Sequence, residues 1–246
     1  MRTERDPKIW FDTIKAFFIM HRFKQSTLDE CLFYNKYSDR TSIDVLLHVD
    51  DGKGTTDTPE RARHLLTALE QQFKVLKVTQ GNKHNYFSMV FNYDRKNRTV
   101  DITIPTYAKK IVESYETPER GNPLTSHTPT LVEVQEAVKL NREEQGKLHS
   151  TIMRIMFYSI LVRPDILCTI NFLSTRTRLK TATQEDKNKL IRLVQNINKT
   201  STDGTTLGEN ITGNIRIFAY ADAAYGVHMD GKFHTGLVIT LGRGPI

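Results

Sequence analysis

Apolar side chains recur every three or four residues in six stretches of the chain, which predicts six amphipathic helices. Two of these stretches begin with a polar residue followed by proline, Asp6 before Pro7 and Thr58 before Pro59, a common start of a helix. Thr183 precedes another stretch, and acidic residues in its first turn strengthen the start signal. The predicted helices cover residues 6–21, 58–73, 105–115, 148–163, 165–173 and 183–197.

Short runs of β-branched and aromatic residues, bounded by polar turn residues, predict strands between these helices. Residues 86–93 and 99–104 are expected to form a hairpin around the polar turn 94–97, and residues 201–214 are expected to form a loop. The pattern as a whole predicts an α+β fold. The predicted strands are residues 32–34, 43–49, 86–93, 99–104, 215–220 and 237–241.

Composition narrows the class of protein and of partner. The chain has 246 residues, 38% hydrophobic and 26% charged, as soluble globular proteins do. Its longest apolar run, about residues 155–162, is too short to cross a bilayer, and the N-terminus lacks the apolar core of a signal peptide. Cys31 and Cys168 lie in apolar contexts and are predicted to be buried thiols in a reducing compartment. We therefore expect an intracellular protein, cytoplasmic or nuclear, with no membrane partner.

The net charge of +7 suits a polyanionic partner such as nucleic acid. Basic residues gather at the predicted hairpin turn and on the helices of the second half, and both groups are candidates for contact with phosphate. A solvated loop explains the basic residues of the hairpin turn equally simply, and charged helix faces are usually just solvated, so both interpretations stay open. The candidate nucleic-acid-binding residues are Arg95, Lys96, Arg98, Arg176, Arg178 and Lys180.

Two adjacent carboxylates follow the apolar run 43–49. Because side chains alternate between the faces of a strand, Asp50 and Asp51 cannot both point into the core. A carboxylate pair at the end of a buried strand is costly to desolvate unless a cation or hydrogen bonds hold it. The pair therefore predicts either a divalent-metal site or a solvated turn before Gly52 and Gly54, since aspartate and glycine are common turn residues.

Four segments in a fixed order favour the metal interpretation. Val49–Asp51 (VDD) ends an apolar strand, and Asp29–Phe33 (DECLF) precedes it. Arg163–Ile166 (RPDI) follows in the second half, and Ala219–Ala223 (AYADA) with Thr235–Gly236 lies near the C-terminus. In sequence and order, these segments resemble the reverse transcriptase of copia-type retrotransposons. The resemblance extends from about residue 10 to the C-terminus.

The resemblance implies magnesium-dependent RNA-directed DNA synthesis by the parent polyprotein. It implies that Asp50 is a direct ligand of Mg²⁺, that Asp51 is a supporting carboxylate, and that Asp222 is the first metal-binding aspartate of a ribonuclease H domain. The implied partners are an RNA or DNA template-primer, a deoxynucleoside triphosphate and a complementing polyprotein segment. The implied organisation is a partial polymerase palm with a primer-grip-like hairpin at 1–116, a linker at 117–141, a helical thumb or connection region at 142–205 and a truncated, incomplete ribonuclease H-like start at 206–246.

The chain also departs from the pattern of this family. The family's first catalytic aspartate lies on an earlier strand, and Asp12, Asp29 and Asp44 stand in no matching context. His48 replaces the usual tyrosine, and Gly52–Gly54 replaces apolar residues of the returning strand. We therefore expect the isolated chain to be inactive as a polymerase. The alternatives are a non-catalytic basic module that binds nucleic acid or a partner, and a decayed element without function.

Overall fold

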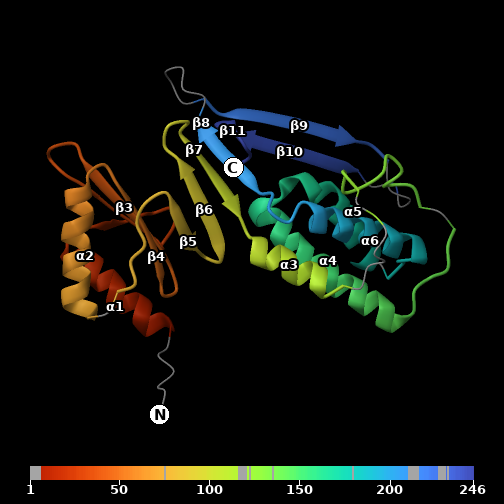
Figure 1. The fold of residues 1–246 in the computed structure, drawn as a ribbon, viewed down its shortest axis with the longest axis horizontal. Helices are drawn as coiled ribbons and strands as arrows, with labels where there is room; N and C mark the ends of the chain where they lie inside the picture. The colour runs from red at the N-terminus through yellow and green to blue at the C-terminus, as the bar shows by residue number, and fades with distance from the viewer. Residues whose placement is uncertain are drawn as a thin grey trace, which may run out of the picture. The chain divides into compact units, whose positions relative to one another are not determined.

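The computed structural model describes residues 7–74, 76–115, 121, 123–134, 136–178, 180–209, 216–226, 231 and 233–246. Within these residues the fold is α+β, with six α-helices and three antiparallel sheets (Figure 1), which confirms the predicted class. The chain divides into two compact units, Met1–Ser88 and Met89–Ile246, which are called unit 1 and unit 2 below.

Unit 1 is a small antiparallel sheet with two helices. The sheet has the order β1–β2–β3–β4, and each strand pairs with its neighbour in sequence. Asp57 and Thr58 connect the last of these strands to α2, which begins at a proline as predicted. The elements are α1 (Pro7–Met20), β1 (Lys24–Gln25), β2 (Leu32–Lys36), β3 (Ser42–His48), β4 (Asp51–Thr56), α2 (Pro59–Phe73) and β5 (Lys83–Tyr86).

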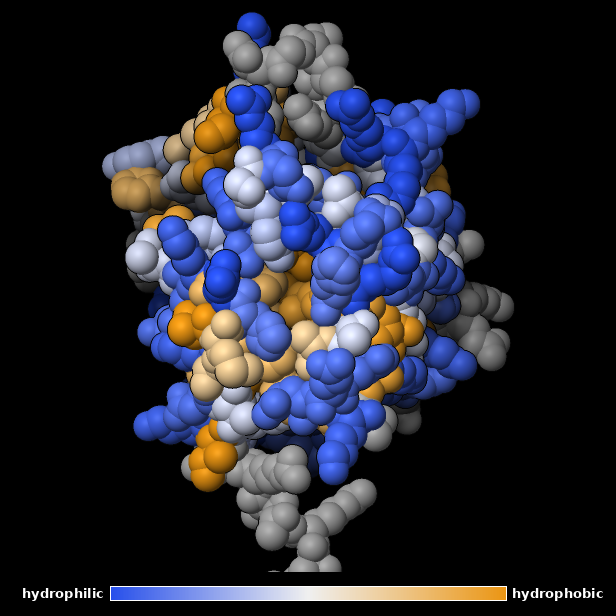
Figure 2. Space-filling view, turned by 90° about the vertical axis from the view of Figure 1, so that its left-hand side faces the viewer, coloured by the Kyte–Doolittle hydropathy of each residue, from blue (hydrophilic) through white to orange (hydrophobic). Residues whose placement is uncertain are grey.

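Aromatic side chains form most of the core of unit 1. Phe18 of α1 stacks on Phe33 of β2 with ring centroids 5.0 Å apart, and both rings are fully buried. The helix α2 has no fully buried residue, and its apolar stripe, which includes Leu65 and Leu69, is only partly buried against this core. In the view of Figure 2, hydrophilic side chains surround a band of apolar surface.

A carboxylate stabilises the turn between β2 and β3. Asp39 Oδ1 accepts hydrogen bonds from the hydroxyl (2.6 Å) and the backbone N–H (3.0 Å) of Thr41, and Asp39 Oδ2 lies 2.9 Å from the guanidinium of Arg61. The guanidinium also stacks over the ring of Tyr37, 3.6 Å from its centroid. The hydrogen bonds from Thr41, assisted by Arg61, lower the pKa of Asp39 to about 2.

This lowered pKa predicts a loss of stability in acid. A carboxylate whose pKa is lower in the folded state stabilises that state above its unfolded pKa of about 3.9, and the contribution disappears as the pH falls through about 2. We expect Asp39→Asn to flatten the loss of stability between about pH 4 and pH 2, measured by urea unfolding at each pH. Asp12→Asn, at an exposed position of α1, is the control and should leave the curve unchanged. An equal effect of both variants would contradict the assignment.

Unit 2 combines helices with an antiparallel sheet and a separate hairpin. The sheet contains the strands β11–β8–β7–β6 in that order, and β9 pairs with β10 alone. The elements are β6 (Met89–Asp94), β7 (Thr99–Thr103), α3 (Pro105–Glu113), α4 (Arg142–Val162), the short 3₁₀ helix η1 (Pro164–Ile166), α5 (Leu167–Arg178), α6 (Gln184–Lys199), β8 (Thr205–Glu209), β9 (Phe218–Ala224), β10 (His234–Thr240) and β11 (Gly242–Arg243).

The core of unit 2 lies mainly among α3, α4, α5 and α6. Ile152 and Ile155 of α4 are fully buried, as are Ile170 of α5 and Leu190 of α6. The helix α4 begins with reciprocal hydrogen bonds between Asn141 and Glu144, and α6 begins with a similar pair, Thr183 and Asp186. None of the described helices is long and apolar enough to cross a membrane.

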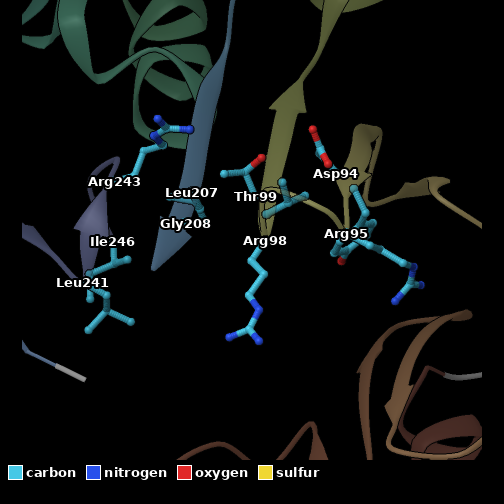
Figure 3. Close-up of a pocket in the computed structure, with 11 residues that line it drawn as sticks. Asp94, Arg95, Arg98, Thr99, Leu207, Gly208, Leu241, Arg243 and Ile246 are labelled. Carbon is cyan, nitrogen blue, oxygen red and sulfur yellow. The ribbon is translucent and has the colours of Figure 1, made fainter. Parts of the chain in front are cut away.

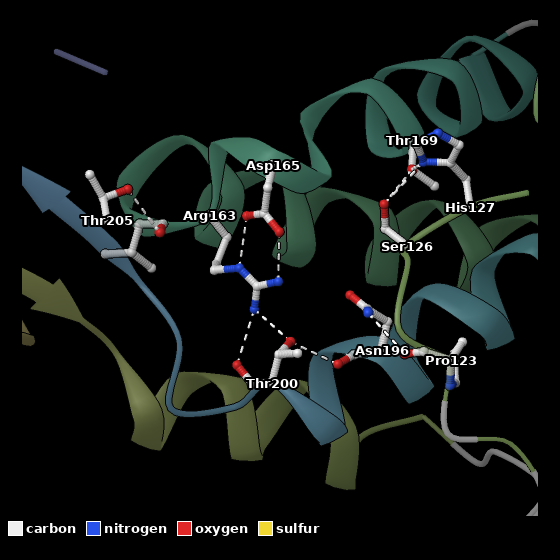
Figure 4. A network of polar contacts seen from close by, with 10 residues as sticks. Pro123, Ser126, His127, Arg163, Asp165, Thr169, Asn196, Thr200 and Thr205 are labelled. Carbon is white, nitrogen blue, oxygen red and sulfur yellow. Dashed lines mark hydrogen bonds and ion pairs between the residues drawn. The ribbon is translucent and has the colours of Figure 1, made fainter. Parts of the chain in front are cut away.

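A buried arginine connects the C-terminal ends of α4 and α6 (Figure 4). Arg163 is 4% exposed and pairs through two hydrogen bonds, of 2.8 and 2.7 Å, with the carboxylate of Asp165. Its third nitrogen donates to the carbonyl (3.1 Å) and the hydroxyl (2.8 Å) of Thr200. Burial opposes the charged form of Arg163, but the Asp165 carboxylate outweighs it, so the pKa of Arg163 is raised. Arg163 and Asp165 of the RPDI segment therefore have a structural role.

Three details differ from the sequence-based expectations. The predicted loop 201–214 contains the strand β8, which pairs with β7. The predicted strand 86–93 is interrupted because Phe87 and Ser88 adopt positive φ values of 51° and 61°. Cys168 was predicted to be buried but is exposed, since it lies on the outer side of α5, and Cys31 is half-buried; both thiols are free.

The compact units group the β6–β7 hairpin with the helices of the second half, whereas the resemblance groups it with residues 1–116. Part of the predicted linker 117–141, namely residues 117–120, 122 and 135, lies outside the described residues. The four-part organisation taken from the resemblance therefore stays a prediction.

Candidate functional site

The two adjacent carboxylates lie at the turn of the β3–β4 hairpin. His48 and Asp51 are the last paired residues, so Val49 and Asp50 form the turn between the strands. Val49 adopts a φ of 53°, a strained conformation for a β-branched residue. Both aspartates are exposed, and neither forms an ion pair with the residues that the structure describes. Gly52 and Gly54 lie within β4. The chain therefore does not leave the sheet at these glycines, and β4 pairs with β3 as far as Thr56.

Aromatic rings surround this turn. The indole N–H of Trp10 in α1 donates to the carbonyl of Val49 over 2.8 Å, so the only tryptophan of the chain is attached to the turn. The ring of His48 packs edge-on against Phe87, with centroids 4.1 Å apart. These contacts hold the turn from α1 and from the segment that follows β5.

Negative charge accumulates at this end of unit 1. Burial raises the pKa of Tyr86, and the negative charges of Asp51 and Asp29 raise it further. Burial likewise raises the pKa of the Cys31 thiol, with contributions from Asp29 and Glu30. A local negative potential of this kind attracts cations and disfavours a reactive thiolate.

The turn supplies few ligands for a metal ion. Among the described residues, no group of three or more histidine, cysteine, aspartate or glutamate side chains is placed to hold a metal. Asp50 and Asp51 alone leave most positions of an octahedral Mg²⁺ ion to water and substrate oxygens. The donor set therefore does not by itself fit a closed metal site.

Asp222, the third predicted metal ligand, belongs to unit 2. It lies on β9 opposite Gly236 of β10, is exposed, and accepts a hydrogen bond from the backbone N–H of Ala223 over 2.9 Å. The predicted strand 215–220 thus continues through Asp222 to Ala224, while residue 215 lies outside the described residues. Among the described residues, Asp222 belongs to no group of three or more histidine, cysteine, aspartate or glutamate side chains that could hold a metal.

The three basic residues of the predicted hairpin turn are exposed together between β6 and β7. Asp94 fixes this turn by accepting hydrogen bonds from the backbone (3.0 Å) and the side chain (2.7 Å) of Asn97, which lower the pKa of Asp94. Arg95, Lys96 and Arg98 are therefore exposed residues of an ordered turn. Arg95 and Arg98 also line a cavity of about 480 Å³, drawn in Figure 3.

The basic residues near the end of α5 divide into two kinds. Arg176 is mostly buried and lies 3.2 Å from the buried carboxylate of Asp186, and it also donates to the carbonyl of Thr181 over 3.0 Å. Its guanidinium therefore holds α5 against the start of α6. Arg178 and Lys180 are exposed and are the two of this set that remain accessible to a ligand.

The sequence pattern did not indicate that Trp10 contacts the carboxylate turn or that Arg243 lines a cavity. Trp10 counted only as one position of an apolar helix face, and its bond to Val49 connects residues far apart in the chain. Arg243 lines the same cavity as Arg98 because β11 pairs with β8, a strand that no pattern predicted.

Comparison of the chain with protein-family models, with curated proteins and with solved structures gave no match. The functional proposal below therefore depends on the residues and on their geometry.

Proposed function

We propose that this chain is a piece of a copia-type retrotransposon polyprotein that binds nucleic acid and does not extend a primer by itself. The parent enzyme would carry out RNA-directed DNA synthesis. The single observation that carries the proposal is the position of Asp50 and Asp51, exposed at the turn of a hairpin in a small antiparallel sheet covered by helices. An exposed carboxylate pair at a sheet's rim is where cations and a strand terminus can approach.

Several features support a role in binding instead of catalysis. Two-metal nucleotidyl transfer requires carboxylates that converge from more than one element. Asp50 and Asp51 come from one turn, and Asp222 belongs to the other unit. Exposed basic residues at the β6–β7 turn and at the end of α5 provide positive charge for phosphate contacts. The separated carboxylates and the exposed basic residues thus support the alternative that the sequence left open, a non-catalytic module.

When bound, Mg²⁺ would supply charge for phosphate oxygens at Asp50 and Asp51. These residues can hold the ion only weakly because two carboxylates from one turn leave most of its coordination to water. We expect titration of Mg²⁺ or Mn²⁺ to change the Trp10 fluorescence of the wild type and of Asp50→Asn by the same small amount. The indole is a local reporter because it donates to the neighbouring Val49 carbonyl. Tight, Asp50-dependent saturation would contradict the prediction.

Primer extension on an RNA template tests the proposal directly. The wild type should retain a labelled primer-template at low salt and should add no nucleotides in the presence of Mg²⁺ and all four triphosphates. Asp50→Asn should behave identically in both measurements, because the turn is not proposed to catalyse. Extension that disappears in Asp50→Asn would establish an active polymerase, whereas failure to bind any primer-template would remove both nucleic-acid functions.

A further inference from the structure

A glycine lies in the wall of the cavity in unit 2. Gly208 of β8 lies opposite Thr99 of β7 on one side and opposite Arg243 of β11 on the other. A Cβ atom at Gly208 would approach a methyl group of Thr99 to 2.9 Å and the Cβ of Arg243 to 3.5 Å. Glycine therefore allows close packing at this point of the cavity wall, because even a methyl group at position 208 would force the side chain of Thr99 to shift.

Apolar side chains surround this cavity. Leu241 and Ile246 lie on one side of it, as Figure 3 shows, and Val100 and Leu207 contribute from β7 and β8. The volume of about 480 Å³ falls within the range of about 300–1,000 Å³ typical of small-molecule sites. The complete lining is Tyr93, Asp94, Arg95, Arg98, Thr99, Val100, Leu207, Gly208, Leu241, Arg243 and Ile246.

The charge at the cavity is predominantly positive. Arg98, at the end of the β6–β7 turn, forms no ion pair with any described residue, and the same is true of Arg243. Asp94, the one acidic side chain in the lining, already accepts hydrogen bonds from Asn97. A guanidinium without a carboxylate partner at the mouth of an apolar cavity favours an anion, which it can bind through two parallel hydrogen bonds.

We propose that this cavity is a binding site for a small carboxylate with an apolar body, such as a medium-chain aliphatic acid. The head group pairs with the guanidinium of Arg98, and the chain covers Gly208 between Leu241, Ile246 and Leu207. Burial of the chain provides affinity without directional contacts, and the guanidinium selects for the anion. This site shares Arg98 with the candidate phosphate contacts of the β6–β7 turn, but it does not involve the carboxylate turn and can bind its ligand whether or not the chain binds nucleic acid.

Calorimetric titration of the full chain with decanoate, below its micelle concentration, tests the site. Saturable binding at one site is expected, with much weaker binding of the uncharged decanol. Arg98→Gln should weaken decanoate about 10-fold to 100-fold, which corresponds to the loss of a charge-assisted hydrogen-bonded pair. Arg154→Gln removes the same charge from an exposed position of α4 outside the cavity, and it should leave the affinity unchanged.

Gly208→Ala provides a second variant that leaves every charge in place. Its methyl group displaces the side chain of Thr99 in the cavity wall, so decanoate affinity should fall while the far-UV circular dichroism stays native. Glutamine accepts the same backbone conformation as Arg98, whose φ is 50°, so Arg98→Gln adds no backbone strain. The proposal is overturned if Arg98→Gln binds decanoate like the wild type, if Arg154→Gln weakens it equally, or if decanol binds as tightly.

Discussion

Raising the salt concentration from about 50 to about 200 mM is expected to weaken binding of a primer-template by about 500-fold. This expectation depends on five exposed basic residues of unit 2. If each neutralises one phosphate, the slope of log affinity against log salt is about −4.5, since each phosphate contact contributes about −0.9. Fluorescence anisotropy of a labelled duplex across a salt series measures this slope. The five residues are Arg95, Lys96, Arg98, Arg178 and Lys180.

Substitutions of the basic residues show which of them are responsible for the salt dependence. Replacing Arg95, Lys96 and Arg98 together with glutamine should reduce the magnitude of the slope by about 2.7. The matched control replaces three other exposed bases of unit 2 with glutamine and should leave the slope unchanged; these are Lys110, Arg142 and Arg154. Equal slopes for the two triple variants would mean that net charge, and not the β6–β7 turn, attracts the nucleic acid. Arg176→Gln should not change the slope, because Arg176 is engaged by Asp186.

Asp165→Ala is expected to lower the free energy of unfolding by about 2–3 kcal/mol. Removing this carboxylate leaves the guanidinium of Arg163, which is 4% exposed, without its charged partner. Breaking a fully buried pair typically costs about 3–5 kcal/mol, but the side chain of Asp165 is 58% exposed, so solvent screens part of its contribution. Urea unfolding followed by far-UV circular dichroism measures the change.

Replacing the other partner of the ion pair should lower the free energy of unfolding less. Arg163→Met removes the buried charge together with its desolvation penalty and keeps most of the packing volume, so we expect a loss of only about 1 kcal/mol. The remaining loss comes from the hydrogen bonds to Thr200. If Arg163→Met proved more destabilising than Asp165→Ala, the guanidinium would stabilise the fold mainly through its hydrogen bonds to Thr200 and not through its ion pair.

Local signals predicted the helices well because their causes are local. Proline at the first position and the Thr183–Asp186 capping pair fix where α1, α2 and α6 begin, and these interactions involve neighbours within one turn. The strand β8 escaped prediction for the opposite reason. Its sequence, TTLGE, is polar and contains glycine, and it becomes a strand because β7 offers hydrogen-bonding partners.

The candidate site also has some features that depend on local sequence and others that depend on tertiary packing. The run 43–49 followed by Asp50 and Asp51 predicted exposed carboxylates at the end of a strand, and the hairpin places both there. The sequence could not indicate that Arg176 is used internally, since Asp186 reaches it only when α5 packs beside the start of α6. It also could not indicate that Arg98 and Arg243 line one cavity.

By itself, the order of residues determined the class of fold, the start of most helices and the exposed pair of acids, because each depends on neighbours in the chain. Only the tertiary structure decided which charges are consumed by internal pairs and which stay accessible. It also decided that position 208 has room only for glycine, since the neighbours of Gly208, Thr99 and Arg243, come from distant segments. Such groups come into contact only when the chain packs, so no local sequence pattern predicts these contacts.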